Sequence, residues 1–291
     1  MSLRGLRPPA HPFLEASTPY EEAEYVILGA PIDETSSHRR GARFAPQAIR
    51  RESLHLETYS PRTGLFFEDL KVADVGDVEA RSLEEALKLI EEVVEGIGRG
   101  GGRPTMIGGE HTVTLAALRA LRPHLVVSLD AHLDLRDRLL GLTLSHGTFM
   151  RRALEELDHR LLVVGCRALS KEELRYAEAH SDRVRVIGAW ERPERLREAM
   201  AEWLESTSRV YVTVDMDVLD PSAAPAVGNP SPEGLSVEVL LNLLGEVLDG
   251  RVVGLDLVEV SPHYDSGGTS LLAAYIILEA LCLWDRGRHI Y

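Results

Sequence analysis

The chain has 291 residues, of which 44% are hydrophobic and 27% are charged, which is typical of a globular protein. Lys and Arg number 32 and Asp and Glu 46, so the formal net charge is −14. This acidic balance argues against nucleic acid or an anionic membrane as the main partner, because both attract clustered basic side chains. It is compatible with a small cationic substrate.

The two cysteines, Cys166 and Cys282, lie in apolar stretches. We expect both to be buried free thiols, which suggests a reducing compartment. The N-terminus has no apolar signal core, and no run of 18 apolar residues occurs, so we expect a cytoplasmic protein. The chain has 2 Asn, 1 Gln, 3 Lys and 29 Arg. Scarce amides suggest a thermophile, although GC-rich coding would give the same excess of Arg over Lys.

Strands and helices are predicted to alternate along the chain. Strands are expected at 25–28, 105–107, 125–129, 161–164, 184–187, 210–214 and 252–257. Helices are expected at 82–97, 112–121, 147–157, 170–180, 193–205, 236–248 and about 270–284. Continuous Val, Ile and Leu strands that alternate with helices predict an α/β fold with a central parallel sheet covered on both faces. Because such sheets bind ligands beyond the carboxyl ends of their strands, residues that follow strands are the first candidates for chemistry.

The first such group follows the strand predicted at 125–129. Asp130, His132 and Asp134 alternate there with Ala and Leu. In an extended segment this spacing places all three side chains on one face. They emerge directly from a buried strand, where charges are costly unless they are paired or bound to metal. We therefore interpret them as metal ligands rather than as a solvated acidic loop.

The second group, Asp215 and Asp217, ends the strand predicted at 210–214 in the same alternating way. Two carboxylates on one face repel each other, and a cation would relieve that repulsion. The alternative is a turn in which Asp215 caps the backbone.

The third group follows the strand predicted at 105–107. Gly108 and Gly109 permit a tight turn, and His111 then begins a helix at the same edge of the sheet. A lone histidine here is more often a capping or core residue, but its position after a third strand favours a functional role.

Together the three groups supply two imidazoles and four carboxylates: His111, Asp130, His132, Asp134, Asp215 and Asp217. Four carboxylates exceed the charge of one divalent ion, so two ions that share carboxylates fit better. Ligands rich in oxygen, with two histidines, favour Mn²⁺ over Zn²⁺. Such a centre can deprotonate a bridging water.

These motifs resemble the ureohydrolase family, which includes arginases and agmatinases. The matching segments are GGEHTVT (108–114), SLDAHLD (128–134), SHGTFM (145–150), VDMDVLDPSAAPAVGNPSPEGLS (214–236) and GLDLVEVSPHYD (254–265), together with 29–50 and 73–78. The resemblance covers about residues 22–284 and implies a three-layer arginase-like α/β fold with a parallel sheet of about eight strands. We expect one ureohydrolase domain over 1–291.

The resemblance also implies two Mn²⁺ ions per subunit and a homotrimer or homohexamer. The first ion would be bound by His111, Asp130, Asp134 and Asp215. The second would be bound by Asp130, His132, Asp215 and Asp217. Asp130 and Asp215 would then bridge the ions.

Two further residues match positions of the family. His146, in SHG, matches a histidine beside the metal centre that shuttles protons and contacts substrate, and the alternative is a residue that caps the next helix. Glu259, in LVEV, matches the carboxylate that binds the substrate guanidinium, and the alternative is a structural ion pair. Asp256 reads as structural, and His263 and Asp265 have no assigned role.

The expected reaction follows from these parts. A metal-bridging hydroxide would attack the guanidinium carbon while Glu259 holds the guanidinium. His146, with Asp217 or Asp134, would relay protons, because an amine leaves readily only when it is protonated. Urea would be the co-product.

The substrate is expected to be a guanidino-amine, since SHGTFM and SPHYD are the agmatinase forms of their motifs. Agmatine would give putrescine, and N1-aminopropylagmatine would give spermidine, so a role in polyamine biosynthesis follows. The loop 135–144 departs from the agmatinase pattern and is expected to line the pocket mouth. Arg136 or Arg138 there could meet the carboxylate of a guanidino acid, so guanidinobutyrate, arginine and formiminoglutamate stay as alternatives.

Two other classes of protein fit the sequence less well. A two-metal phosphohydrolase usually adds Lys or Arg for the phosphate, and these motifs lack them. A non-catalytic homologue would be expected to have lost a ligand or Glu259, and all are present.

Overall fold

The computed structural model describes residues 5–205 and 207–288 and contains a nine-stranded sheet in the order β1-β5-β2-β6-β11-β10-β7-β8-β9. The strands are β1 (Leu6–Arg7), β2 (Tyr25–Ala30), β5 (Val72–Val78), β6 (Arg103–Gly108), β7 (Leu125–Leu129), β8 (Arg160–Cys166), β9 (Val184–Gly188), β10 (Val210–Asp215) and β11 (Val252–Val258). Eight strands pair in parallel, and only the short β1 pairs antiparallel, with β5. A small hairpin, β3 (Tyr59–Ser60) and β4 (Leu65–Phe66), lies outside this sheet. The predicted α/β fold with a parallel central sheet is confirmed.

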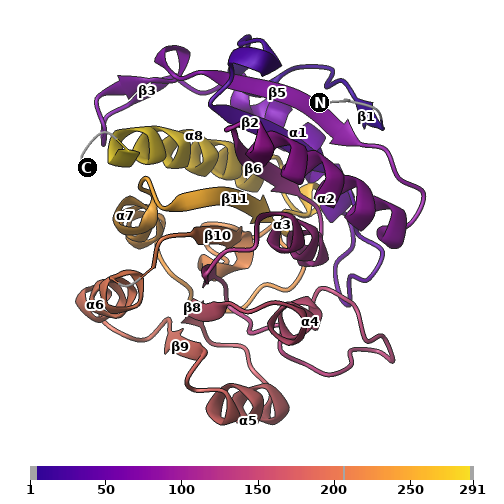
Figure 1. Ribbon diagram of the computed structural model, residues 1–291, viewed down its shortest axis with the longest axis vertical. Coiled ribbons are helices and arrows are strands. Elements are labelled where there is room, and N and C mark those ends of the chain that lie inside the picture. The colour runs from indigo at the N-terminus through magenta and orange to yellow at the C-terminus, as the bar shows by residue number, and fades with distance from the viewer. Residues whose placement is uncertain (1–4, 206, 289–291) are drawn as a thin grey trace.

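Helices cover both faces of the sheet. They are α1 (Ala45–Ser53), α2 (Leu83–Arg99), α3 (Thr114–Leu121), α4 (Phe149–Glu156), α5 (Lys171–Ala179), α6 (Pro193–Leu204), α7 (Val237–Val247) and α8 (Gly268–Arg288). On one side α2 packs against α3 and α3 against α4, while on the other α8 packs against α1 and α7, and α7 against α6 (Figure 1). The side-chain hydroxyls of Ser82, Ser170 and Ser236 accept a backbone N–H at the start of α2, α5 and α7, which satisfies one donor that each helix leaves free.

The strands are hydrophobic on both faces because each face has its own helical layer. In β7, Leu125, Val127 and Leu129 enter the core that includes α6, α7 and α8. Val126, between them, enters the core that includes α2, α3 and α4. This explains why the strands read as continuous apolar runs rather than as alternating ones.

The longest helix, α8, is long and apolar enough to cross a membrane by length and composition alone, but 67% of its apolar window is buried inside the fold. Trp284 is fully buried and donates its indole N–H to the carbonyl of Asp249 at 3.1 Å. Cys282 on α8 and Cys166 on β8 are buried and free, as predicted. The helix therefore has the packing of a core element.

The strand β5 and the helix α1 were not among the elements predicted from the hydrophobic pattern, and neither were the two-residue strands β1, β3 and β4. Asp74 and Asp77 interrupt the apolar pattern of β5, so the strand was missed. Arg50 of α1 forms ion pairs with both carboxylates, at 2.7 Å with Asp74 and 2.5 Å with Asp77, and all three side chains are buried. Charges within a buried strand are compensated here by a partner that is distant in sequence.

Candidate active site

The six predicted ligand residues converge at the carboxyl ends of neighbouring strands. β6, β11, β10 and β7 are adjacent in the sheet, and the segments that follow them supply these side chains and Glu259. All of them except Asp130 border a cavity of about 160 Å³. Residues far apart in sequence therefore meet because parallel strands all end at one edge of the sheet.

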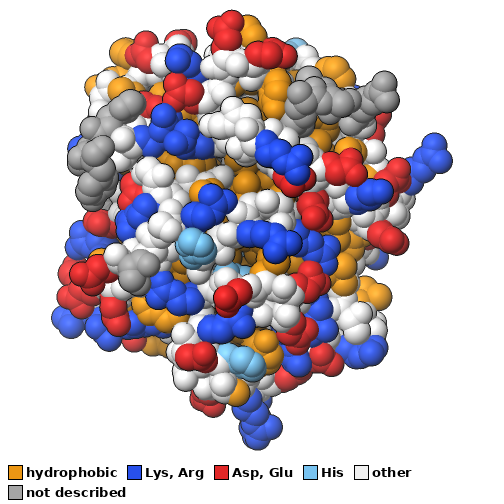
Figure 2. Space-filling view, viewed as in Figure 1, with side chains coloured by type: hydrophobic (Ala, Val, Ile, Leu, Met, Phe, Trp, Pro, Cys, Tyr) orange, Lys and Arg blue, Asp and Glu red, His pale blue; other side chains and the backbone are white. Residues whose placement is uncertain are grey.

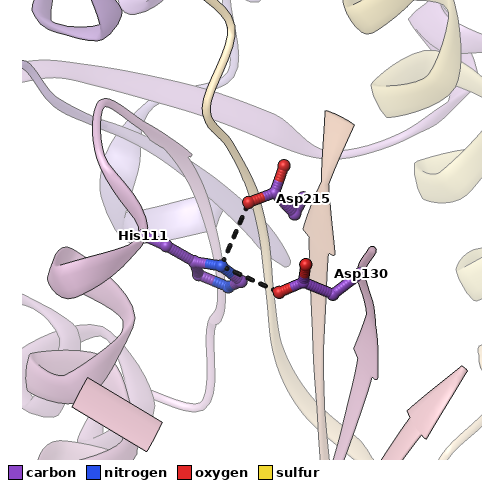
Figure 3. A group of neighbouring side chains, drawn as sticks. All are labelled: His111, Asp130 and Asp215. Atoms are coloured by element: carbon purple, nitrogen blue, oxygen red, sulfur yellow. Dashed lines mark ion pairs between the residues drawn. The ribbon is translucent and has the colours of Figure 1, made fainter. Parts of the chain in front are cut away.

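The Nδ1 atom of His111 faces three carboxylates. It lies 3.2 Å from Asp130 Oδ2, 3.3 Å from Asp134 Oδ2 and 3.2 Å from Asp215 Oδ2 (Figure 3 shows two of these contacts). This nitrogen is buried, yet it has no hydrogen-bond partner among the described residues. A buried polar atom without a partner is costly. A cation between the imidazole and the carboxylates would satisfy it.

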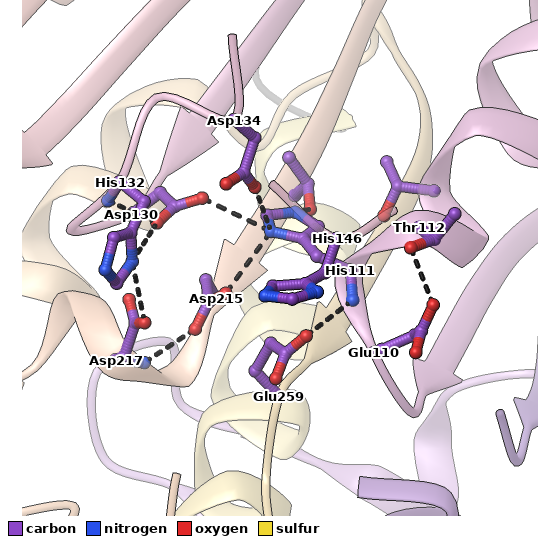
Figure 4. A network of polar contacts seen from close by, with 12 residues as sticks. Glu110, His111, Thr112, Asp130, His132, Asp134, His146, Asp215, Asp217 and Glu259 are labelled. Carbon is purple, nitrogen blue, oxygen red and sulfur yellow. Dashed lines mark hydrogen bonds and ion pairs between the residues drawn. The ribbon is translucent and has the colours of Figure 1, made fainter. Parts of the chain in front are cut away.

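A second cluster lies beside the first and shares Asp130. His132 Nδ1 lies 3.0 Å from Asp217 Oδ2 and 3.7 Å from Asp130 Oδ1 (Figure 4). The Oδ1 atom of Asp215 accepts the backbone N–H of Asp217 at 2.8 Å, so this carboxylate also lies between the two clusters. The site therefore contains two groups of nitrogen and oxygen atoms, one with His111 and one with His132. Within each group the atoms lie close enough together to bind a metal ion.

The local backbone differs from the extended alternation expected from sequence. β7 ends at Leu129 and β10 ends at Asp215, so the residues that follow are not strand. Asp134 has φ of 54°, in the left-handed region, and Asp217 lies in the 3₁₀ turn Met216–Val218. The convergence was predicted correctly, but irregular backbone achieves it. A non-glycine residue in the left-handed region costs free energy, and such strain is common at functional sites.

The electrostatics of the cluster fit a divalent cation. Burial and, to a smaller extent, the charge of Asp130 raise the pKa of Asp134 to about 7. Burial, with the charges of Asp217 and Asp130, also raises the pKa of Asp215 well above its ordinary value. Each raised pKa means that, in the protein without a bound cation, the ionised form of the carboxylate is less favourable than in water. Positive charge bound among them would restore the ionised forms, and the donor set of two imidazoles and four carboxylates suits such ions.

Glu259 follows β11 and is buried beside the clusters. Its Oε1 atom accepts the backbone N–H of His111 at 2.7 Å. Its φ is 67°, a second strained backbone position at this site. A Cβ atom on Gly228 would lie 2.7 Å from Glu259 Oε2, so a larger residue there would displace the Glu259 carboxylate. Burial raises the pKa of Glu259 to about 8, and a bound guanidinium would favour its ionised form.

His146 lies on the same cavity and is held by two hydroxyl residues that the sequence analysis did not single out. Its Nε2 atom lies 3.0 Å from Ser37 Oγ, and its backbone N–H donates to Thr35 Oγ1 at 3.0 Å. Thr35 in turn donates to the buried carboxylate of Glu110 at 2.7 Å. Burial lowers the pKa of His146 to about 4, so the imidazole is neutral near pH 7. The run ETSS (34–37) is rich in hydroxyl groups, but nothing in its spacing links it to position 146.

The loop 135–144 forms part of the cavity wall. Arg136 and Leu139 border the cavity, whereas Arg138 is exposed and donates to the carbonyl of Gly141. Arg136 lies 3.5 Å from the buried carboxylate of Glu173, which also accepts the backbone N–H of Leu135 at 3.3 Å. The expectation that this loop lines the pocket is met by residues 136 and 139. Helix α5 holds this part of the loop in place.

Three residues without a predicted catalytic role, Asp256, His263 and Asp265, make structural contacts. Asp265 accepts the backbone N–H of Thr269 at 2.7 Å and so caps α8. His263 packs against Phe44, with ring centroids 4.7 Å apart. Asp256 lies buried beneath His111, where it accepts three hydroxyl hydrogen bonds.

With this geometry established, comparison with known proteins identifies the family, because the model of the arginase family matches residues 23–283. The chain belongs to the arginase family. It is therefore a ureohydrolase, a hydrolase of guanidino C–N bonds, from a family of binuclear metal enzymes.

Individual members of the arginase family resemble the chain over nearly its full length. It is 38% identical to the mitochondrial guanidino acid hydrolase of Homo sapiens, over 92% of this chain and 80% of that protein. It is 37% identical to the agmatinase of Bacillus subtilis, over 92% of this chain and 94% of that protein. The crystal structure of the agmatine ureohydrolase of Thermoplasma volcanium superimposes with a TM-score of 0.88 at 36% identity, over 94% of each chain. These relatives differ in the substrates that their names state, so the choice of substrate has to be argued from the site.

Proposed function

We propose that this chain is a manganese-dependent ureohydrolase that releases urea from a guanidino-amine, with agmatine as the parent substrate. The observation that carries the proposal is the position of Glu259, whose buried carboxylate borders the same cavity as the two ligand clusters. One of its oxygens, Oε1, is held by the His111 backbone, and Oε2 has no hydrogen bond to a described residue. A carboxylate so placed can orient a guanidinium through charge and hydrogen bonds together.

The charges around the cavity support a cationic substrate. Of the five acidic residues that line it, Asp134, Asp215 and Asp217 are assigned to the metal ions and Glu173 is paired with Arg136, which leaves the carboxylate of Glu259 for a cationic guanidinium. Arg136 is the one Lys or Arg among the described lining residues, and it is paired with Glu173. A substrate with an amine tail leaves the ion pair between Arg136 and Glu173 intact, whereas a carboxylate tail would have to compete with Glu173 for Arg136.

Mn²⁺ is the proposed metal because the donor atoms are mainly carboxylate oxygens with two imidazoles. His111, Asp130, Asp134 and Asp215 would hold one ion, and Asp130, His132, Asp215 and Asp217 the other. Two such ions would supply an activated water and Lewis-acid polarisation at the guanidinium carbon.

His146 is proposed to move the proton that the leaving amine requires. Its neutral imidazole at pH 7 can accept a proton at the cavity and then donate it, because the group is not already charged. Ser37 fixes the ring through its contact with Nε2 at 3.0 Å. Asp134 and Asp217, which border the same cavity, are the further candidates for proton relay.

The partner is proposed to be a small molecule rather than a nucleic acid or a membrane. Figure 2 shows one face of the molecule, on which blue Lys and Arg side chains are interspersed with red Asp and Glu side chains. Such mixed surfaces do not create the single-sign field that binds polyanions. A homotrimer or homohexamer is the assembly expected from the family resemblance.

A guanidino acid is the second candidate substrate, favoured by the identity to the human guanidino acid hydrolase and by the position of Arg136 at the cavity. It would require Arg136 to exchange Glu173 for the substrate carboxylate.

Urea release from the Mn²⁺-loaded protein tests the proposal. Agmatine, N1-aminopropylagmatine, arginine and 4-guanidinobutyrate are compared by kcat/KM. We expect one of the two amines to have the highest kcat/KM. The ratio of kcat/KM for N1-aminopropylagmatine over agmatine then reports how strongly the cavity contacts the longer tail. Preference for 4-guanidinobutyrate or arginine would overturn the amine proposal, and no urea from any of them would overturn the simple guanidine class.

A further inference from the structure

A fully buried carboxylate, Asp256, lies one layer below the candidate metal ligands. It lies in β11, directly opposite Thr213 of β10 in the strand register. Asp256 takes part in none of the ion pairs found among residues 5–205 and 207–288, although burying an unpaired carboxylate is costly. A position in the core thus holds a carboxyl group that the packing of the sheet does not need.

Three hydroxyl groups compensate for this burial. Thr114 Oγ1 and the Tyr211 hydroxyl donate to Oδ2 of Asp256, at 2.8 and 2.7 Å. Thr213 Oγ1 donates to Oδ1 at 2.5 Å. An ionised carboxylate only accepts hydrogen bonds, so each hydroxyl directs its single proton toward Asp256.

The hydrogen bond from Thr213 to Asp256 determines which ring nitrogen of His111 carries a hydrogen. Thr213 Oγ1 also lies 2.8 Å from His111 Nε2. Because the hydroxyl proton is already donated to Asp256, the oxygen can only accept from the ring, and Nε2 must carry a hydrogen. In the neutral imidazole the lone pair is then on Nδ1, the atom that faces Asp130, Asp134 and Asp215.

We propose that Asp256 is a positioning residue that acts through Thr213 to hold His111 in the tautomer and ring orientation required to bind the first metal ion. Histidine ligands generally donate their second ring nitrogen to a fixed acceptor, which sets the tautomer and strengthens the ligand. Here a threonine hydroxyl is inserted between the imidazole and the carboxylate. The inference rests on the metal centre of the proposed function but not on the identity of the substrate.

Thr114 provides the control that separates this role from ordinary core packing. Thr114 and Thr213 are both fully buried and both donate to the same carboxylate, but of the two hydroxyls only that of Thr213 contacts the His111 ring. If the network only stabilised the core, replacing either hydroxyl would have the same effect. Thr213→Val and Thr114→Val each remove one hydroxyl with almost no change of shape, so they form a matched pair.

The experiment measures metal affinity without substrate. Metal-free protein is prepared with a chelator and titrated with Mn²⁺ and with Co²⁺, whose visible absorption follows ligand binding directly. We expect Thr213→Val to weaken the affinity of one site by about 10- to 100-fold, and to leave the other site, which His132 serves, close to wild type. Thr114→Val should bind both ions with wild-type affinity, even if it lowers the unfolding temperature.

Thr213→Ser restores the hydroxyl and should restore the affinity. Equal metal affinities in Thr213→Val and Thr114→Val, or a failure of Thr213→Ser to recover binding, would overturn the proposal. If Thr213→Val does not fold, Thr213→Ala tests the same contact without branching, and wild-type affinity in that variant would also overturn it. Because no guanidine is present, an error in the proposed substrate cannot produce either result.

Discussion

The backbone N–H of His111 donates a hydrogen bond to the side chain of Glu259 at 2.7 Å. These residues follow β6 and β11, which are neighbours in the sheet. The contact joins the first candidate metal ligand to the candidate guanidinium-binding residue, so the position of one depends on that of the other. In the proposed function, substrate orientation and metal binding therefore both depend on this one hydrogen bond.

Gly228→Ala should displace the Glu259 carboxylate without changing any candidate metal ligand. The new Cβ would lie 2.7 Å from Glu259 Oε2, too close for the carboxylate to keep its place. We expect kcat/KM for agmatine to fall by about 100-fold, since misplacement by about an ångström has effects of that size, while metal content stays at the wild-type level. Gly250→Ala is the control, because a Cβ there meets no atom within 4 Å. Wild-type kinetics in Gly228→Ala would contradict the placement of Glu259.

Glu259→Gln should separate charge from shape. The amide oxygen can still accept the His111 N–H, but the negative charge that attracts a guanidinium is lost. Because charge-assisted hydrogen bonds contribute about 1.5–3 kcal/mol, kcat/KM should fall by about 10- to 100-fold. Metal content, measured by atomic emission on the same sample, should not change. A variant with full activity would mean that Glu259 does not touch substrate.

Asp217→Ala should remove one metal ion per subunit. The carboxylate lies 3.0 Å from His132 Nδ1 in the second cluster, and its loss leaves that ion with fewer ligands. We expect urea release to fall by more than about 100-fold, because even residues behind the ligands have effects approaching that size. Asp220→Ala changes an acid three residues away that caps a turn through Ser222, and it should keep both ions. Full metal content and activity in Asp217→Ala would refute the ligand assignment.

Leu139→Ala should change the preference for tail length. Leu139 borders the cavity and packs toward Gly147, so its removal widens the wall beside the substrate tail. We expect the ratio of kcat/KM for N1-aminopropylagmatine over agmatine to rise by about 10-fold, the size of a hydrophobic contact in a selective pocket. Leu140→Ala alters the next residue, which is 77% exposed, and should leave the ratio unchanged. An unchanged ratio in Leu139→Ala would show that the tail leaves the cavity by another route.

His159 should contribute to destabilisation in acid. It is buried, both ring nitrogens lack a partner among the described residues, and burial lowers its pKa to about 4. Because the unfolded state binds a proton near pH 6.5 and the folded state does not, His159 lowers stability as pH falls between these values. His159→Phe should therefore lose about 2 kcal/mol less stability than wild type between pH 7.5 and pH 5.

Unfolding by urea at the two pH values measures this difference. His124→Gln changes an exposed histidine and should behave as wild type. Equal losses in wild type and His159→Phe would show that the buried ring is not a source of acid sensitivity.

Local sequence was sufficient to predict both structure and site wherever one segment contains an apolar strand pattern followed directly by candidate ligands. The run from Leu125 to Asp134 contains an apolar strand and then acids interleaved with apolar residues, so the strand, its buried end and a ligand cluster could all be predicted. The helices with serine caps were also predicted to within a few residues, because the cap and the apolar pattern are local. β5 and α1 were missed, because the acids of β5 are compensated by Arg50 from another part of the chain.

The order of the strands had no local signal. The adjacency of β6, β11, β10 and β7 places Glu259 against His111, although 148 residues separate them. Thr35 and Ser37 could not be assigned for the same reason, since they reach His146 only through the folded loops.

The sequence by itself determined the class of fold, the edge of the sheet where chemistry occurs and the residue types that gather there, because hydrophobic period and residue chemistry are local properties of the chain. Tertiary structure alone decided which atoms face one another. Nδ1 of His111 faces three carboxylates, Nε2 contacts Thr213, and Asp134 and Glu259 adopt left-handed backbone. Those features depend on strand register and on packing between distant segments, where the free energy of the whole fold compensates for strain that no local pattern would predict.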